Sequence, residues 1–265
     1  ITISPSSWMG PLAVGQTVQS GFAYNGSSNF VATSTTPNTK ITIKPPTSTQ
    51  PPTTPIPPTT PSVPVIPNTS NQKIFGYYSE WSIYQRQFNV ENIPVKQLTH
   101  ILYAFMLPNP SQADFNTLAS NMPFPPKPYT PPPTIPEGTL VSQDVYANDI
   151  NISKLRTLKS QNPNVHIIIS VGGWTMGWTL SKIAATPSLR SVFIKSSVDF
   201  VIKNGFDGLD IDWEFPGVQG VGYNIVDPVN DPINFITLLK ELRAEFNSRS
   251  TTKHYEITAA VGCNP

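Results

Sequence analysis

Five short and nearly continuous apolar runs mark the second part of the chain, at residues 73–78, 98–106, 166–171, 207–213 and 255–261. Runs of this length without polar alternation are typical of parallel strands that are covered on both faces. The segments between them carry helix signals, so strand and helix alternate. This order predicts an α/β fold, either a doubly wound sheet or a (β/α)8 barrel, and the periodicity alone does not choose between the two.

Two of the connecting segments begin with a recognisable helix start. Thr186 precedes Pro187 and Asp231 precedes Pro232, which is the pattern of an N-cap followed by proline at the first helical position. Downstream of the second start, five apolar side chains recur at helical spacing. They are Phe235, Leu238, Leu239, Leu242 and Phe246. We predict that this stripe packs into the core.

The first 72 residues have a different character. Residues 1–44 contain short runs separated by Gly, Ser and Asn, which predicts β-strands joined by turns. Residues 45–67 hold ten prolines in twenty-three positions and favour polyproline II, which would reach on the order of 70 Å. We therefore predict a linker over 45–72, before a larger domain at 73–265. A ligand for a proline-binding domain is the alternative interpretation of the linker.

Composition narrows the classes of partner. Seventeen basic and sixteen acidic residues give a net charge of +1, so nothing suggests nucleic acid or an anionic membrane as a partner. The single cysteine, Cys263, excludes an internal disulfide or a multi-cysteine metal site. A charged fraction of only 12% and the Thr/Pro linker fit an exported protein. We expect a secreted, extracellular monomer.

The segment 205–217, GFDGLDIDWEFPG, carries the clearest chemistry. Four carboxylates lie within eight residues, Asp207, Asp210, Asp212 and Glu214. Alternate residues of a strand share a face, so the last three should point to one side. Like charges this close force one member to hold a proton, which predicts Glu214 as a general acid and Asp212 as the neighbour that shares its proton. A solvated acidic loop or a calcium site is the alternative, but the intervening residues are Leu, Ile and Trp rather than Gly and polar residues.

These residues resemble the DxxDxDxE pattern of glycoside hydrolase family 18, the chitinases. Three further segments carry the likeness in the right order: FGYYSEW at 75–81, LTHILYAF at 98–105 and SVGG at 170–173 followed by Trp174. The resemblance covers about residues 73–265 and is closest to the bacterial-type enzymes, whose first strand carries a Tyr and then a Trp three residues on. Residues 1–44 also resemble, over about thirty positions, part of a cellulose- or chitin-binding β-sandwich.

The resemblance implies a (β/α)8 barrel that hydrolyses β-1,4 links between N-acetylglucosamine units, with chitin or chitooligosaccharides as its partners and no metal or other cofactor. Glu214 would protonate the glycosidic oxygen and Asp212 would orient the acetamido group, whose carbonyl oxygen attacks C1 in place of an enzyme nucleophile. Asp210 would tune Asp212 from behind. This substrate-assisted scheme retains the β configuration.

Substrate-binding residues are expected at the carboxyl ends of the strands, where a barrel presents its site. Flat rings there can stack on sugar faces, and the two glycines would allow close approach of the backbone beneath the site. The expected set is Tyr78, Trp81, Phe105, Trp174, Asp207, Gly172 and Gly173. Core packing is the alternative for each ring. The proline-rich segment 123–136 follows the second strand and would either wall the cleft or decorate the surface.

His100, His166 and His254 are far apart in the sequence and lie in or beside strands. We expect core or surface histidines here rather than ligands.

Five strands are visible and a barrel needs eight. The chain also begins at Ile1 and stops at Pro265 directly after a strand-like run. We therefore expect a fragment of a longer enzyme, poorly active or unstable when isolated. Two other functions stay open, namely a chitin-binding lectin that has lost catalysis and an endo-β-N-acetylglucosaminidase acting on N-glycans. Lectin relatives usually replace the acid, whereas this chain keeps Glu214.

Overall fold

The computed structural model describes residues 2–3, 41–42, 72–119 and 131–262. The chain divides into two units, Ile1–Ser62 and Val63–Pro265. In the first, β1 (Thr2–Ile3) pairs antiparallel with β2 (Ile41–Thr42). The rest of the expected binding module, the proline-rich linker, most of the 123–136 segment and Cys263 lie outside the described residues.

The second unit is built on a sheet of six strands. Five are parallel and stand in the order β3-β4-β6-β7-β8, and the short β5 (Leu140–Ser142) pairs antiparallel with the end of β4. The parallel strands are β3 (Phe75–Ser79), β4 (His100–Pro108), β6 (His166–Gly172), β7 (Gly208–Asp212) and β8 (Glu256–Ala259). The five strands expected from the apolar runs are confirmed. Since the parallel strands follow one another in chain order without reversal, the sheet has the topology of a barrel rather than of a doubly wound fold.

The sheet is curled so that its concave face brings distant strands together. The Tyr77 hydroxyl on β3 lies 3.4 Å from Asp210 Oδ2 on β7. These strands are three places apart, which in a flat sheet would separate them by about 14 Å. The parallel strands therefore form an arc of a (β/α)8 barrel, and alternate side chains line its interior.

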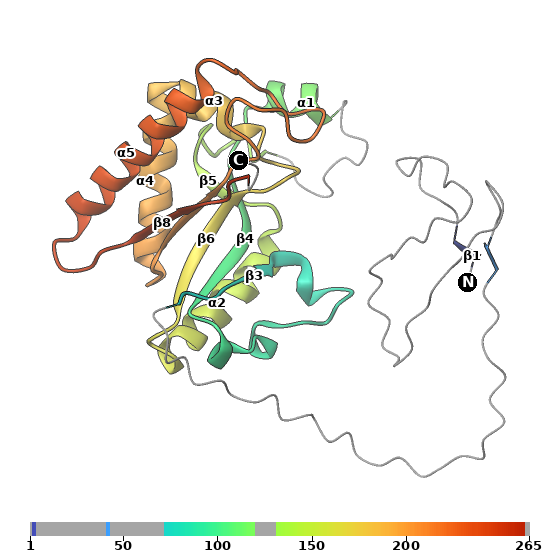
Figure 1. Cartoon of the computed structure of the whole chain (residues 1–265), viewed down its shortest axis with the longest axis vertical. Coiled ribbons are helices and arrows are strands. Elements are labelled where there is room, and N and C mark those ends of the chain that lie inside the picture. Colours follow the sequence, from blue (N-terminus) through green and yellow to red (C-terminus); the bar gives the residue numbers. More distant parts are fainter. Residues whose placement is uncertain (1, 4–40, 43–71, 120–130, 263–265) are drawn as a thin grey trace, which may run out of the picture. The chain divides into compact units, whose positions relative to one another are not determined.

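Helices α2 (Val145–Gln161), α3 (Thr179–Ala185), α4 (Pro187–Lys203) and α5 (Asp231–Arg249) pack along the convex side of this arc, and α1 (Gln112–Ala119) lies beyond the end of β4 (Figure 1). Three 3-10 turns, η1 (Glu80–Ile83), η2 (Val90–Asn92) and η3 (Val95–Gln97), lie between β3 and β4 in the chain. Outward-facing Ile167, Leu209 and Ile211 are fully buried and belong to one apolar cluster with Phe193 of α4 and Leu242 of α5. The core thus lies between sheet and helices, which leaves the concave face to polar chemistry.

Both expected helix starts are close to those observed. Helix α4 begins at Pro187 after Thr186, as predicted. Helix α5 begins at Asp231 itself and Asn230 occupies the N-cap position. Asp231 is buried and accepts a hydrogen bond from Ser181 Oγ at 2.8 Å, so it links α5 to α3. The apolar stripe of α5 packs inward, with Leu238, Leu242 and Phe246 buried. Among the described residues, no helix combines the length and apolar character needed to cross a bilayer.

Candidate active site

Three carboxylates line the concave face toward the carboxyl end of β7. Asp210 and Asp212 belong to the strand and are almost fully buried, and Glu214 follows two residues later and is partly exposed. Glycine at position 208, where the strand begins, is required because a Cβ there would lie 2.1 Å from the carbonyl oxygen of Glu256. The alternation of the strand therefore places the acids on one face, at the end of the barrel where catalytic residues are found.

Asp210 is held by three hydroxyl groups from three other strands. Ser170 Oγ donates to Oδ2 at 2.7 Å, Thr258 Oγ1 donates to Oδ1 at 2.6 Å, and the Tyr77 hydroxyl lies 3.4 Å from Oδ2. Hydrogen bonds of this kind stabilise a carboxylate in its charged form. Burial, followed by the charges of Asp210 and Asp212, raises the pKa of Tyr77 well above its ordinary value, so its phenol stays protonated and remains a donor.

Asp212 is the member of the cluster that keeps a proton. Burial first, then the charges of Glu214 and Asp210 and a side-chain hydrogen bond with Glu214, raise its pKa to about 7. The second oxygen, Oδ1, is buried and has no hydrogen-bond partner among the described residues. Asp212 can therefore share a proton with Glu214 near neutral pH, and Oδ1 has an unused acceptor position.

Aromatic rings stand beside the acids. Phe105 lies 6.3 Å, centroid to centroid, from both Tyr77 and Trp81. Trp81 is 48% exposed, and Trp174, which follows β6, is 49% exposed. These four rings come from the carboxyl-terminal parts of β3, β4 and β6 or from the segments directly after them. Exposed rings at the rim of a polar site are suited to stack on the apolar faces of sugars.

Tyr78 does not belong to this group, and its expected role in substrate binding is wrong. It is 3% exposed, stacks on Tyr103, and its hydroxyl lies 3.1 Å from the carbonyl of Phe88 and 3.2 Å from Asn151 Oδ1. The ring therefore points to the convex face, beneath α2. Because neighbouring residues of a strand face opposite sides, the ring on the concave face is that of Tyr77.

The two adjacent tyrosines provide a matched test of this assignment. Tyr77→Phe removes a hydroxyl from Asp210 and is expected to lower kcat about 10-fold, the cost of a hydrogen bond to a charged group, with little change in thermal stability. Tyr78→Phe should instead lower the melting temperature, because buried Asn151 Oδ1 loses the hydroxyl that donates to it. We expect kcat to be unchanged. Steady-state kinetics and calorimetry of the full-length variants check both. Equal kinetic effects of the two substitutions would contradict the assignment.

Gly172 and Gly173 shape the floor of the site through backbone geometry. Their φ values are +110° and +79°, a region that side chains disfavour. A Cβ on Gly172 would lie 2.4 Å from the carbonyl oxygen of Asp212, and one on Gly173 would lie 2.8 Å from the Phe105 ring. The Gly173 N–H also donates to the Asp212 carbonyl at 2.8 Å. The glycines thus let β6, β7 and the Phe105 ring approach closely beneath the acids.

Asp207 lies at the opposite end of β7, so its expected place among the substrate-binding residues is wrong. Its Oδ2 accepts the Ile167 N–H at 2.8 Å, and Lys159 and Lys253 lie 2.9 and 3.1 Å from its carboxylate. Burial opposes ionisation of Asp207, but the Ile167 N–H and the two ammonium groups hold its pKa below the usual value. Asp207 is a structural anchor between β6, β7 and α2.

Two of the three histidines are brought together, contrary to expectation. The rings of His100 and His166 lie 4.8 Å apart at the amino ends of β4 and β6, and both contact the Glu256 carboxylate. His254 is exposed. The two histidines are register partners on the neighbouring strands β4 and β6, and the sequence alone gave no sign of this register.

Sequence reasoning also missed the two smaller donors to Asp210. Ser170 and Thr258 are each in register with Asp210 on the strands that flank β7. Strand alternation places Ser170 and Gly172 on the same face of β6. Ser170 could therefore have been predicted as a donor to Asp210 once β6 and β7 were assumed to be neighbours. Thr258 could not, because the sequence does not give the register of β8.

Comparison with known proteins agrees on one family. The model of the glycosyl hydrolases family 18 matches residues 73–265. Chitinase A1 of Niallia circulans is 36% identical over 217 residues, covering 72% of this chain and 30% of that protein. An endochitinase of Manduca sexta is 30% identical over 196 residues, with the same two shares. The chain thus spans about a third of the length of these relatives.

Solved structures show the same likeness. Chitinase ChiA74 from Bacillus thuringiensis superposes with a TM-score of 0.57 at 33% identity, covering 72% of this chain and 35% of that one. The Group IV chitinase of Ostrinia furnacalis, solved in complex with allosamidin, gives a TM-score of 0.54 at 29% identity, with shares of 72% and 44%. The likeness therefore extends to the three-dimensional arrangement of about 72% of the chain.

Proposed function

Because the chain belongs to glycosyl hydrolase family 18, we propose that the full-length protein hydrolyses chitin, the β-1,4-linked polymer of N-acetylglucosamine. The observation that carries the proposal is the pair of buried Asp212 and partly exposed Glu214, in which Asp212 retains a proton near pH 7 and has one unpartnered carboxylate oxygen. The names of the relatives, which are chitinases from bacteria and insects, support the substrate.

In the proposed reaction, Glu214 donates a proton to the glycosidic oxygen as the bond from that oxygen to C1 breaks. The acetamido carbonyl oxygen of the same sugar attacks C1 and closes a five-membered oxazolinium ring, so the electron pair comes from the substrate. Water then adds to C1 with Glu214 as general base, which reopens the ring and restores the acid. Two inversions at C1 give net retention, and no second carboxylate at nucleophile distance is needed.

The neighbouring acids divide the remaining tasks. Asp212 Oδ1 would accept the acetamido N–H, which turns the carbonyl oxygen toward C1 and compensates the cationic ring that forms. The hydroxyls of Ser170 and Thr258 hold the Asp210 carboxylate in place. After burial, Asp210 is one of the neighbouring charges that raise the pKa of Asp212. The cluster thus holds an acid that is still protonated at neutral pH.

The rings at the rim would position the polymer. Trp81, Phe105 and Trp174 offer apolar faces beside the acids, and the pyranose faces carry apolar axial C–H bonds. Tyr77, between Phe105 and Asp210, would close the end of the subsite. Stacking of this kind orients the scissile bond and leaves the polar groups of the sugar free for hydrogen bonds.

Product analysis of the full-length protein tests the proposal. We expect chitohexaose to be cut to shorter oligomers whose new reducing ends are β anomers by proton NMR in the first minutes, before mutarotation. Cleavage of a high-mannose glycoprotein but not of chitohexaose would replace the proposal with an endo-β-N-acetylglucosaminidase. Binding of chitin without any turnover would replace it with a lectin, and initial α anomers would exclude substrate assistance.

The domain organisation, export and monomeric state stay predictions from sequence. A carbohydrate-binding module over 1–44 and a linker over 45–72 would serve a secreted enzyme that acts on an insoluble polymer. Chitin pull-down of the separate N-terminal segment would test the first of these.

A further inference from the structure

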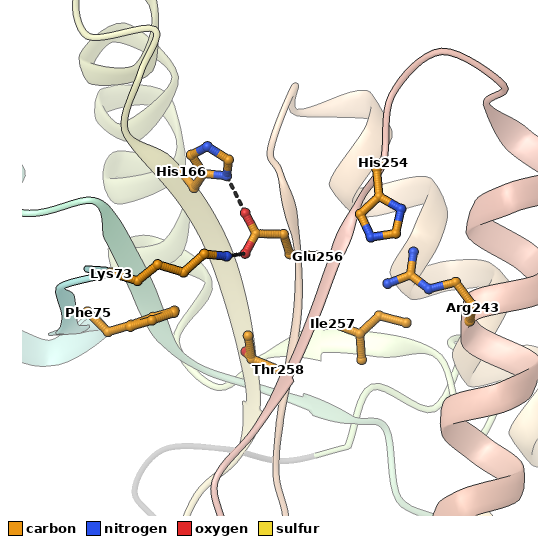
Figure 2. Close-up of a pocket in the computed structure, with 8 residues that line it drawn as sticks. All are labelled: Lys73, Phe75, His166, Arg243, His254, Glu256, Ile257 and Thr258. Atoms are coloured by element: carbon orange, nitrogen blue, oxygen red, sulfur yellow. Dashed lines mark hydrogen bonds and ion pairs between the residues drawn. The ribbon is translucent and has the colours of Figure 1, made fainter. Parts of the chain in front are cut away.

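A second cluster of ionisable groups lies on the concave face, at the amino ends of the strands. It consists of His100 on β4, His166 on β6 and Glu256 on β8, and their donor atoms all lie within 4.8 Å of one another. His100 Nε2 is 3.1 Å from Glu256 Oε2, and His166 Nδ1 contacts Oε1. Figure 2 shows the Glu256 carboxylate between His166 and Lys73, with His254 and Arg243 on the other side of the strand.

The hydrogen bonds behind His100 are compatible with a ring proton on Nδ1. Thr99 Oγ1 accepts the Ile74 N–H at 2.6 Å and donates to the Ile74 carbonyl at 3.0 Å. When the hydroxyl proton is engaged in this way, Oγ1 accepts from His100 Nδ1, which lies 2.7 Å away and carries the ring proton. The neutral ring then presents the lone pair of Nε2 to both oxygens of Glu256, at 3.1 and 3.2 Å. In this tautomer both Nε2 and the carboxylate have lone pairs to offer a cation, whereas a proton on Nε2 would give an ordinary hydrogen bond to Glu256.

We propose that this cluster binds a divalent transition-metal ion, best matched by Zn²⁺, through His100 Nε2, His166 Nδ1 and the Glu256 carboxylate. Two imidazoles and one carboxylate are a common zinc ligand set, and Zn–N bonds of about 2.0–2.1 Å place neighbouring ligands about 3.3 Å apart. The separation of His100 and Glu256 is close to that value. Thr99 supplies the outer hydrogen bond that metal-binding histidines usually make.

The surroundings leave room for a fourth ligand. His166 and Glu256 line a pocket of about 450 Å³, so a water molecule can complete a tetrahedron. Lys73 Nζ lies 3.1 Å from Glu256 Oε2 and competes for the same carboxylate. Its side chain is 59% exposed, however, and can swing into solvent when a metal ion takes its place. Phe75 stacks on the His100 ring at 4.2 Å and holds it in position.

The metal would have a structural role, separate from the acids. It would join the amino ends of β4, β6 and β8, strands that are not all neighbours in the sheet, and so fix the curl. Glu256 and Thr258 lie on the same face of β8, and Thr258 donates to Asp210. A fixed β8 therefore also fixes one of the donors of the catalytic cluster.

Zinc titration of the tag-free full-length protein against a chromophoric chelator tests the site. We expect one Zn²⁺ per chain, at least 10-fold weaker binding for His166→Asn and Glu256→Gln, and tighter binding for Lys73→Met, which removes the competing charge. His254→Asn is the matched control, since this histidine lines the same pocket outside the ligand set, and its affinity should equal that of the wild type.

Two further measurements distinguish the loss of the metal site from a failure of the variant to fold. Zn²⁺ should raise the melting temperature of the wild type and not that of His166→Asn, whose zinc-free melting temperature shows whether it is folded. Co²⁺ should give the intense visible bands of a tetrahedral site only where His166 is present. The proposal would be overturned if the wild type bound Zn²⁺ no more tightly than His166→Asn. It would also be overturned if His254→Asn lost as much affinity for Zn²⁺ as His166→Asn. The cluster would then be a group of ion pairs without a metal. Chitin hydrolysis is not part of this readout.

Discussion

Glu214→Gln is expected to lower kcat on a chromogenic chitotriose analogue by roughly 10²–10⁴-fold, the usual cost of removing a placed general acid. The amide keeps the shape and hydrogen-bonding capacity of the side chain but cannot deliver a proton to the glycosidic oxygen. KM should change little, because the rings and Asp212 remain in place. Initial rates of the full-length variant at several substrate concentrations separate the two constants.

Glu80→Gln is the matched control for this substitution. Glu80 also follows a strand, but it is buried and lies in η1. Its pKa is raised to about 8 by burial and then by the charge of Asp144. Its carboxyl is therefore neutral at pH 7 and resembles an amide. We expect a small change in melting temperature and no change in kcat. A rate loss in Glu80→Gln as large as that in Glu214→Gln would mean that the acid has been misassigned.

The strands of the arc were predictable because each is buried on the convex side by helices. Burial forces the outward positions, such as Ile167 and Ile169 of β6, to be apolar, and the run HIIISV then stands out in the sequence. The short β5 was not expected. It pairs antiparallel with the last residues of β4 and carries only three residues, too few to show a pattern.

Tyr78 was predicted to bind substrate because it lies near the carboxyl end of its strand, but that position does not show which face of the sheet the side chain occupies. A one-residue change of phase moves a side chain to the other face of the sheet, and the sequence YY offers the same residue type on both. The buried partners of Tyr78, Asn151 and Tyr103, come from other elements and cannot be found from its neighbours. The acids were placed correctly on one face because Ile211 and Trp213 between them fix the phase.

Asp207 and the histidine pair depend on contacts that no local pattern encodes. Lys159 and Lys253 reach Asp207 from positions 48 and 46 residues away. Glu256 meets His100 across 156 residues only because the sheet is curled. The strands and the acid motif follow from local spacing, whereas the ion pairs of Asp207 and the histidine cluster follow from strand order, register and the curl of the sheet.

Asp212→Asn is expected to change activity and stability in opposite directions. The amide cannot share a proton with Glu214 or compensate the cationic intermediate, so kcat should fall by roughly 10²-fold or more. Stability should rise, because Asp212 is a buried acid whose pKa is raised to about 7 by burial and by the neighbouring charges of Glu214 and Asp210. Ionising it in the folded chain is costly, and asparagine never ionises.

The pH dependence identifies the cause of that stabilisation. In the unfolded chain Asp212 loses its proton near pH 4, and in the folded chain only near pH 7. The contribution of Asp212 to the stability of the wild type therefore falls as pH rises from about 4 to 7, by about 2–4 kcal/mol, and Asp212→Asn lacks this decrease. Calorimetry at pH 4.5 and pH 8 should show a small advantage of the variant at the lower pH and the full advantage at the higher. An advantage that is the same at both pH values would trace the effect to packing instead, and the proton held by the acidic pair would need another location.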